Sequence, residues 1–440
     1  MRIFRKLLLC SKFEVPETHK IYYTALKKIT PYSIVHLPSI ISNTYDSSTK
    51  EGVITCISDI TYIGDRTFYN CTDLRGITIP DSVTSIENSA FHACTQLKNI
   101  NIPNGVTDIG NNAFNSCALT SITIPDTVTN IGYESFCRCN DLQSVNIPKN
   151  VINIGIAAFS GCTGNIYIDC DIKSQYKITQ KIFGNSVFNT VTFSDNVTII
   201  NHSVLADCTM NNLIISKSVQ DIKSQYDQSL GLNPELWHYW VVKDSISVDK
   251  DNPIFTDDSN CLINKNTNTL IKGCNNSIIP NYVKTIYSYA FSSCVLNNFI
   301  IPNNIQSAGS YPFMYTKGNI IVQCDISNIE GLFLFSRFDI IDLNNDNIVS
   351  LPNYIFKGSS IKKIIFSKNI TTISSTAFDY ATIDVIDLTR FESIPNFWEN
   401  MYTKCQFIVP DALYDDWIVA ENWSTYADHI VKASEYTETT

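Results

Sequence analysis

The sequence predicts a β-rich solenoid, a fold that stacks one short structural unit many times. Three markers recur at steps of 22 or 23 residues: an Ile-Pro pair, a Phe, and a Cys three residues after that Phe. The pairs end at Pro80, Pro103, Pro125 and Pro148, and the Phe–Cys pairs are 68–71, 91–94, 114–117, 136–139 and 159–162. Three markers that keep one phase over five units indicate a repeat array.

Each position in a unit has a structural reason. One unit, LRGITIPDSVTSIENSAFHACTQ, runs from Leu74 to Gln96. In Ile77-Thr78-Ile79 the two Ile side chains point to one side and Thr78 to the other, as in a half-buried strand. Pro80 lacks an N–H and therefore ends the strand. We expect Ala90–Cys94 to form a single helical turn, because residues three apart share a helix face.

The expected core follows from stacking. A single unit has too few apolar side chains to fold alone, but stacked units bury matching residues in continuous columns. At about 4.8 Å per coil, about 12 to 14 coils would form an arc or rod roughly 60 Å long. The residues expected in the core columns are Ile79, Phe91, Cys94, Ile102, Phe114, Cys117, Phe136, Cys139, Phe159 and Cys162.

These units resemble the BspA-like branch of the leucine-rich repeats, which reads L-x-x-I-x-I-P-x-x-V-x-x-I-G-x-x-A-F-x-x-C. The resemblance covers roughly residues 56 to 410 and is specific at Ile102-Pro103, Ile109-Gly110, Ala113-Phe114 and Cys117. It implies a leucine-rich-repeat solenoid, cell-surface adhesion and binding of host proteins. The pattern weakens over residues 172–245, where we expect irregular coils.

Composition and spacing divide the chain into five segments. We expect an N-terminal cap over 1–55, repeats over 56–225, an irregular insertion with a hairpin over 226–275, repeats over 276–410 and a helical cap over 411–440. The caps are expected because the terminal coils of a solenoid would otherwise expose their core.

Composition and motifs argue against catalysis, metal binding and nucleic-acid binding. The net charge is −10, and no Lys and Arg cluster suits phosphate binding. The six His form no HExxH motif, and the Cys residues lack zinc-site spacing. We therefore expect no enzyme, no cofactor and no metal site. The Cys residues keep the phase of the repeat, so we expect reduced, buried thiols rather than disulfides.

Function must then be inferred from shape, because a solenoid presents a long rigid face that suits recognition of a protein or a surface glycan. No apolar run is long enough to span a membrane, and the apolar stretch after Met1 is too short for a conventional secretion signal. A binding or adhesion protein at a cell surface is the main hypothesis. The alternative is a bacteriophage virion component, because the ending N-W-S-x-Y-A-D-x-I resembles those in gut Bacteroidetes and their phages. An enzyme is a distant third.

Two surfaces are candidate binding sites. The first is the outward face of the strands, with one row of Thr78, Asn101, Thr123 and Asn146 and a second of Arg75, Lys98 and Gln143. The second is the aromatic-rich break that contains Trp237, Tyr239 and Trp240, since Trp and Tyr are enriched at interaction hot spots. The alternatives are that the rows are merely solvated and that the aromatic residues pack against neighbouring coils.

Overall fold

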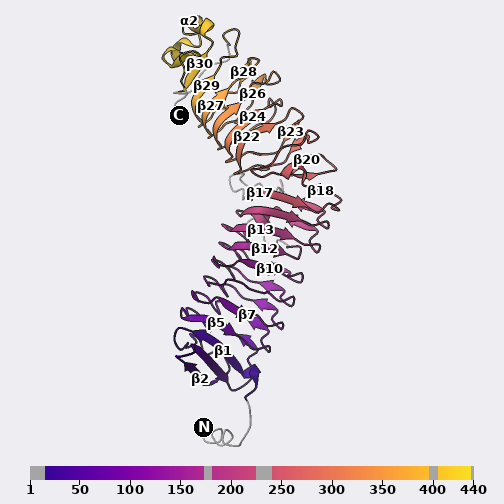
Figure 1. Cartoon of the computed structure of the whole chain (residues 1–440), viewed down its shortest axis with the longest axis vertical. Helices are drawn as coiled ribbons and strands as arrows, with labels where there is room; N and C mark the ends of the chain where they lie inside the picture. The colour runs from indigo at the N-terminus through magenta and orange to yellow at the C-terminus, as the bar shows by residue number, and fades with distance from the viewer. Residues whose placement is uncertain (1–14, 173–180, 224–239, 396–404, 438–440) are drawn as a thin grey trace, which may run out of the picture. The chain divides into compact units, whose positions relative to one another are not determined.

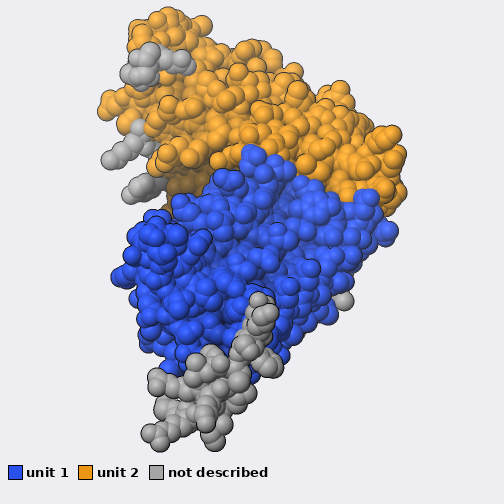
Figure 2. Space-filling view, turned by 60° about the horizontal axis from the view of Figure 1, so that its bottom comes forward, with its two compact units in different colours: residues 1–210, 218–240 blue, residues 211–217, 241–440 orange. Residues whose placement is uncertain are grey.

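The structure is a computed structural model that describes residues 15–172, 181–223, 240–395 and 405–437. Across these ranges the chain forms a β-solenoid of about 15 turns, slightly more than the sequence suggested, with many strands and few helices (Figure 1). It divides into two compact units, one over 1–210 and 218–240 and the other over 211–217 and 241–440 (Figure 2). None of the helices in the described ranges has the length and apolar character needed to cross a bilayer.

Unit 1 begins with strands that extend the sheet of the repeats. After η1 (Glu17–His19), β1 (Lys20–Ala25) lies between β3 (Glu51–Cys56) and β5 (Leu74–Thr78) and is antiparallel to both. β2 (Ile40–Asp46) pairs with the other side of β3. The strands before residue 57 therefore continue the sheet that contains β5.

The repeats of unit 1 form two walls of parallel strands. The long strands are β5, β7 (Asn99–Asn101), β10 (Ser144–Ile147), β12 (Thr163–Ile168) and β13 (Val187–Phe193). The two-residue strands are β4 (Tyr62–Ile63), β6 (Ser85–Ile86), β8 (Asp108–Ile109), β9 (Asn130–Ile131) and β11 (Asn153–Ile154). They are followed by β14 (Ile199–Asn201), η2 (His202–Leu205) and β16 (Asp221–Lys223), of which β14 and β16 pair in parallel. Most of β15 (Thr209–Ile215) belongs to unit 2.

Unit 2 contains β17 (Val241–Val248) and a short antiparallel meander that leads into parallel strands. The meander consists of β18 (Phe255–Thr256), η5 (Asp258–Asn260), β19 (Leu262–Asn264) and β20 (Thr269–Lys272), and β20 then pairs in parallel with β21 (Thr285–Ile286). The meander is thus the first part of a sheet that continues through β21 to β23 (Ser307–Ala308).

A seven-stranded parallel sheet runs through the rest of unit 2. Its strands are β22 (Val295–Ile301), β24 (Lys317–Val322), β25 (Arg337–Asp342), β27 (Ser360–Ile365), β29 (Thr382–Asp387), β30 (Gln406–Val409) and β31 (Ile430–Lys432), and β26 (Ser350–Leu351) pairs separately with β28 (Thr372–Ile373). The helical part of the C-terminal end is minor: η6 (Asp411–Leu413), α2 (Tyr414–Trp417) and η7 (Ser424–His429). Trp417 and Trp423 are buried there and close the core.

The core consists of stacked columns. Every residue named above for a core column is buried. From Phe68 to Phe159, successive Phe rings lie 5.1–5.3 Å apart with interplanar angles of 2–12°. Unit 2 repeats the arrangement, with Phe291 and Phe313 at 5.0 Å. Between Phe68 and Phe159, each Phe ring is therefore stacked on the Phe of the adjacent coil.

The structure differs from the expected helical turn around Phe91. Ser89 and Ala93 adopt left-handed backbone conformations, with φ of 54° and 60°. The N–H groups of Ser89, Phe91 and Ala93 donate to carbonyls of the following coil, whereas those of the residues between them stay within their own coil. A helix would direct all of them along its own axis. The segment is therefore a run of tight turns that forms a third hydrogen-bonded wall.

Glycine follows the short strands because the coils meet closely there. A Cβ atom on Gly110 would lie 2.5 Å from a main-chain atom of the preceding coil, and one on Gly155 would lie 2.3 Å away. Neither distance admits a side chain. The Ile-Gly pair of the repeat is thus explained by contact between backbones.

Candidate binding surface

The outward side chains of the long strands in unit 1 line up across the sheet. Tyr22 of β1 pairs with Thr78 of β5, and Thr78 pairs with Asn101 of β7. All three side chains are exposed. They are aligned because neighbouring strands are in register and every second residue points outward.

The same row continues over the next coils. Asn146 of β10 pairs with Tyr167 of β12, and a bridge between Ile122 and Val145 places Thr123 beside Asn146. We call the set Tyr22, Thr78, Asn101, Thr123, Asn146 and Tyr167 the strand row. The four residues that the sequence places in one row therefore point to one side of the sheet, and two tyrosines flank them.

Sequence reasoning missed both tyrosines. Tyr22 lies in the antiparallel strands, whose order cannot be read from the repeat. Tyr167 lies between Ile166 and Ile168, just as Thr78 lies between two Ile, so alternation could have identified it. The Ile-Pro marker is absent from that unit, which hid its phase.

The second predicted row lies where the chain enters each strand. The N–H of Lys98 donates to the carbonyl of Arg75 at 2.9 Å, and the N–H of Gln143 donates to that of Thr120 at 3.0 Å. Thr120 in turn donates to Lys98 at 3.2 Å, so the four residues follow one another along the sheet. Arg75, Lys98 and Gln143 are all exposed.

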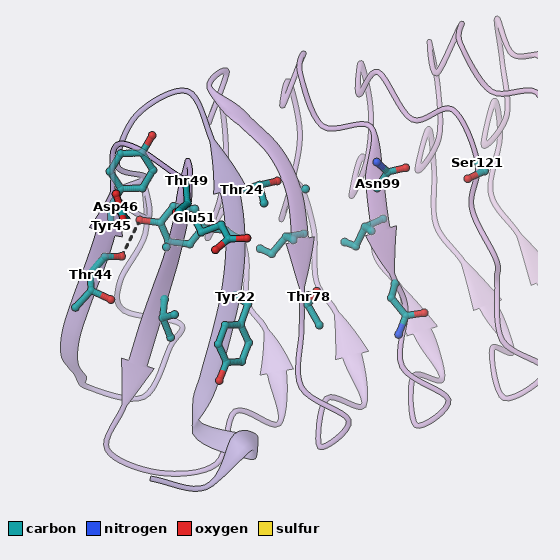
Figure 3. Close-up of a pocket in the computed structure, with 17 residues that line it drawn as sticks. Tyr22, Thr24, Thr44, Tyr45, Asp46, Thr49, Glu51, Thr78, Asn99 and Ser121 are labelled. Carbon is teal, nitrogen blue, oxygen red and sulfur yellow. Dashed lines mark hydrogen bonds between the residues drawn. The ribbon is translucent and has the colours of Figure 1, made fainter. Parts of the chain in front are cut away.

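A groove of about 1000 Å³ covers the first strands of this sheet (Figure 3). Thr78 and Asn101 line it together with Tyr22, whereas Arg75 and Lys98 do not. Figure 3 shows Tyr22 and Thr78 in one row and Thr24 and Asn99 in another. The groove therefore lies over the beginning of the strand row.

One end of the groove is acidic. Asp46 of β2 and Glu51 of β3 are cross-strand neighbours that line it. The carboxylate of Asp46 accepts hydrogen bonds from the Ser48 hydroxyl at 2.6 Å and the Ser48 N–H at 2.8 Å, which lower the pKa of Asp46. The other lining side chains offer mainly hydroxyl and amide groups, and none is His or Cys. This chemistry suits hydrogen bonding to a ligand.

The aromatic-rich break, the second candidate surface, presents no exposed aromatic side chain within the described residues. Trp237 and Tyr239 lie outside the described residues. Trp240 is 2% exposed. Its large ring is thus removed from water, as expected for a side chain that packs in a core, and it offers no surface to a partner.

The cysteines form a ladder of free thiols. None of the fourteen Cys in the described ranges forms a disulfide, and Cys94, Cys117, Cys139 and Cys162 are buried. Cys71 is only half-buried, contrary to expectation, because it belongs to the first coil of the ladder. Burial raises the pKa of the Cys162 thiol to about 12. Such thiols are poor nucleophiles, because the reactive thiolate forms only at high pH. No group of three or more possible metal ligands occurs within the described ranges.

Comparison with known proteins identifies the family. A family model described as "BspA type Leucine rich repeat region (6 copies)" matches residues 17–139, 61–173, 107–229 and 263–384, which together make up well over half of the chain. No curated protein matches.

Solved structures with a similar repeat include a leucine-rich repeat protein from Eubacterium ventriosum, 18% identical, with a TM-score of 0.41 and coverage of 86% of this chain and 91% of that one. A leucine rich cell surface protein from Faecalibacterium prausnitzii is 25% identical, covers 82% of each chain and has a TM-score of 0.40. The extent of the family match decides the assignment, and the chain belongs to the BspA-type leucine-rich repeat family.

Proposed function

We propose that this protein is a non-enzymatic binding protein that holds an extended segment of a protein or surface glycan across the strand row. The observation that carries the proposal is the alignment of exposed Tyr, Thr and Asn side chains across neighbouring strands, with a groove over the beginning of the row.

The chemistry of the row supports an extended ligand. Tyr22 and Tyr167 are 39% and 43% exposed, and five steps between strands separate them by roughly 24 Å. Tyr side chains give a large contact area at low entropic cost. The Thr and Asn side chains between them offer donors and acceptors at each coil, so a ligand that lies along the solenoid axis can bond repeatedly.

Binding to arrayed glycans and to a panel of extracellular proteins tests this proposal. We expect the triple variant Thr78→Ala, Asn101→Ala, Asn146→Ala to weaken binding of any identified ligand by at least about 1 kcal/mol. Asn104→Ala is the matched control, because Asn104 is exposed in the turn after a strand. Charge reversal of Arg75 and Lys98 examines the second row. A ligand that binds the triple variant as tightly as the wild type would place the site elsewhere.

A virion role is the alternative that the ending of the chain suggests, and it requires a different experiment. Mass spectrometry of secreted, particle and cytosolic fractions from the source would distinguish a surface protein from a particle component. Recovery in purified particles alone would favour the virion role.

A further inference from the structure

Two left-handed backbone positions flank the buried Phe of many coils, and the two units fill the second of them differently. In unit 1 the residues two positions after the Phe are small or polar, such as Asn70 and Ala93. In unit 2 this position is Ser293 or Gly358 in two coils, but it holds the aromatic residues Tyr315 and Phe335 in two others, with φ of 59° and 52°. Left-handed backbone is uncommon for bulky side chains. Since unit 1 builds the same turn without them, these rings are not required by the turn, and strain of this kind points to a function.

The two rings form one platform on adjacent coils. Their centroids are 5.9 Å apart and their planes differ by 19°. A Cβ atom on Gly358, in the following coil, would lie 2.3 Å from Phe335, so the glycine leaves room for the ring. Each side chain is nevertheless 41% exposed. The platform thus lies against the following coil at Gly358 and is open to solvent.

Two cations accompany the rings. Lys317 and Arg337 follow Tyr315 and Phe335 by two residues, with one buried residue between each pair, and both cations are exposed. They are direct neighbours in the pairing of β24 with β25. The nearby acid Asp339 is paired with Lys362 at 2.7 Å. Among the described residues neither Lys317 nor Arg337 has an ion-pair partner. In unit 1 the corresponding position after Ala93 is Thr95.

We propose that Tyr315, Lys317, Phe335 and Arg337 form a binding site for an acidic saccharide. The C–H faces of a sugar ring would stack on the aromatic platform, and its carboxylate would lie between the two cations. An Arg guanidinium binds carboxylates through two parallel hydrogen bonds. The net charge of −10 opposes binding of a long polyanion such as nucleic acid more than binding of a short acidic saccharide. This site lies in unit 2 and does not depend on the strand row.

Calorimetric titration of the full chain with tri-galacturonic acid tests the site, with neutral galactotriose as the matched ligand. We expect galactotriose to bind at least tenfold more weakly. Phe335→Asn and Arg337→Gln should each weaken tri-galacturonic acid binding at least tenfold. Phe335→Asn should keep the melting temperature of the wild type, because Asn70 occupies the same position in unit 1. Arg138→Gln, at that position in another coil of unit 1, is the control and should bind normally.

Two further titrations examine whether the site prefers another class of anionic ligand. A hexaglutamate peptide and a thymidine hexanucleotide are titrated under the same conditions, and both should bind more weakly than tri-galacturonic acid. The proposal is overturned by no binding of tri-galacturonic acid, by equal binding of galactotriose, by tighter binding of the peptide or nucleotide, or by full binding in both site variants. The alanine variant of the strand row should bind tri-galacturonic acid normally, so the two proposals can fail separately.

Discussion

The thiol of Cys117 donates a hydrogen bond to the main-chain carbonyl of Phe91 in the preceding coil, with the sulfur 3.1 Å from the oxygen. Cys94, Cys139 and Cys162 repeat this contact at 3.0–3.3 Å. In later coils a buried hydroxyl replaces the thiol, as in Thr316, whose Oγ1 donates to the carbonyl of Phe291 at 3.0 Å. The ladder position therefore selects a small side chain that can donate a hydrogen bond as well as pack in the core.

Cys117→Ser and Cys117→Val separate the two roles of the thiol. If it acts as a donor, Ser should stay within about 1 kcal/mol of the wild type, and Val should cost more because it brings no donor. Urea unfolding gives both free energies. A Val variant more stable than the Ser variant would show that apolar packing, not the hydrogen bond, governs this position.

Alkaline pH should destabilise the protein through the same ladder. Burial raises the pKa of Cys162 to about 12, from 9.0 for an ordinary thiol. A group whose pKa is higher in the folded state stabilises fully below its unfolded pKa and loses that contribution as the pH rises. We expect the free energy of unfolding to fall above about pH 9, by roughly 1.4 kcal/mol per pH unit for each such thiol. Cys162→Ser should show a shallower fall between pH 9 and 11 in urea titrations, and an unchanged slope would contradict this assignment.

Phe114→Ala should strongly destabilise the fold. The ring is fully buried and stacks on Phe91 at 5.3 Å and on Phe136 at 5.2 Å. Removing it leaves a cavity in the column, for which a cost of about 3–5 kcal/mol is expected. Chemical denaturation measures it, with exposed Thr123→Ala as the control. A loss below about 1 kcal/mol, as at a surface site, would contradict the column.

Gly155→Ala tests the contact between backbones. The added methyl group would lie 2.3 Å from the main chain of the preceding coil, so the coils must separate. We expect a loss of more than about 2 kcal/mol, as for other overpacked sites. Gly105→Ala is the milder control, since its nearest atom would be 3.2 Å away. Equal melting temperatures for the two variants would argue against close contact at Gly155.

The sequence predicted the fold well because its markers are those that stacking requires. Ile79, Phe91 and Cys94 are buried in columns as their phase indicates. The turn around Phe91 was misjudged, because a spacing of three is common to a helical turn and to tight turns with left-handed residues. Only the hydrogen bonds to the following coil distinguish them.

The candidate site could be predicted only in part. Alternation placed Thr78 and Asn101 on one side of the strands, and the structure aligns them. The register of the antiparallel β1, which brings Tyr22 to Thr78, depends on contacts that local sequence does not encode. The platform of Tyr315 and Phe335 was also missed, because both residues look like ordinary apolar positions until their backbone conformation is known.

The turn wall around Phe91 also gives the array a direction. Alternate N–H groups of this wall donate to the following coil, and the carbonyl groups that accept them point to the preceding coil. Each coil therefore has one donor face and one acceptor face. Any coil can therefore follow any other without loss of hydrogen bonds on this wall. Deletion or duplication of a whole unit rejoins matching faces, whereas a change of a few residues does not. The length of such a protein is thus a variable that evolution can alter in single steps.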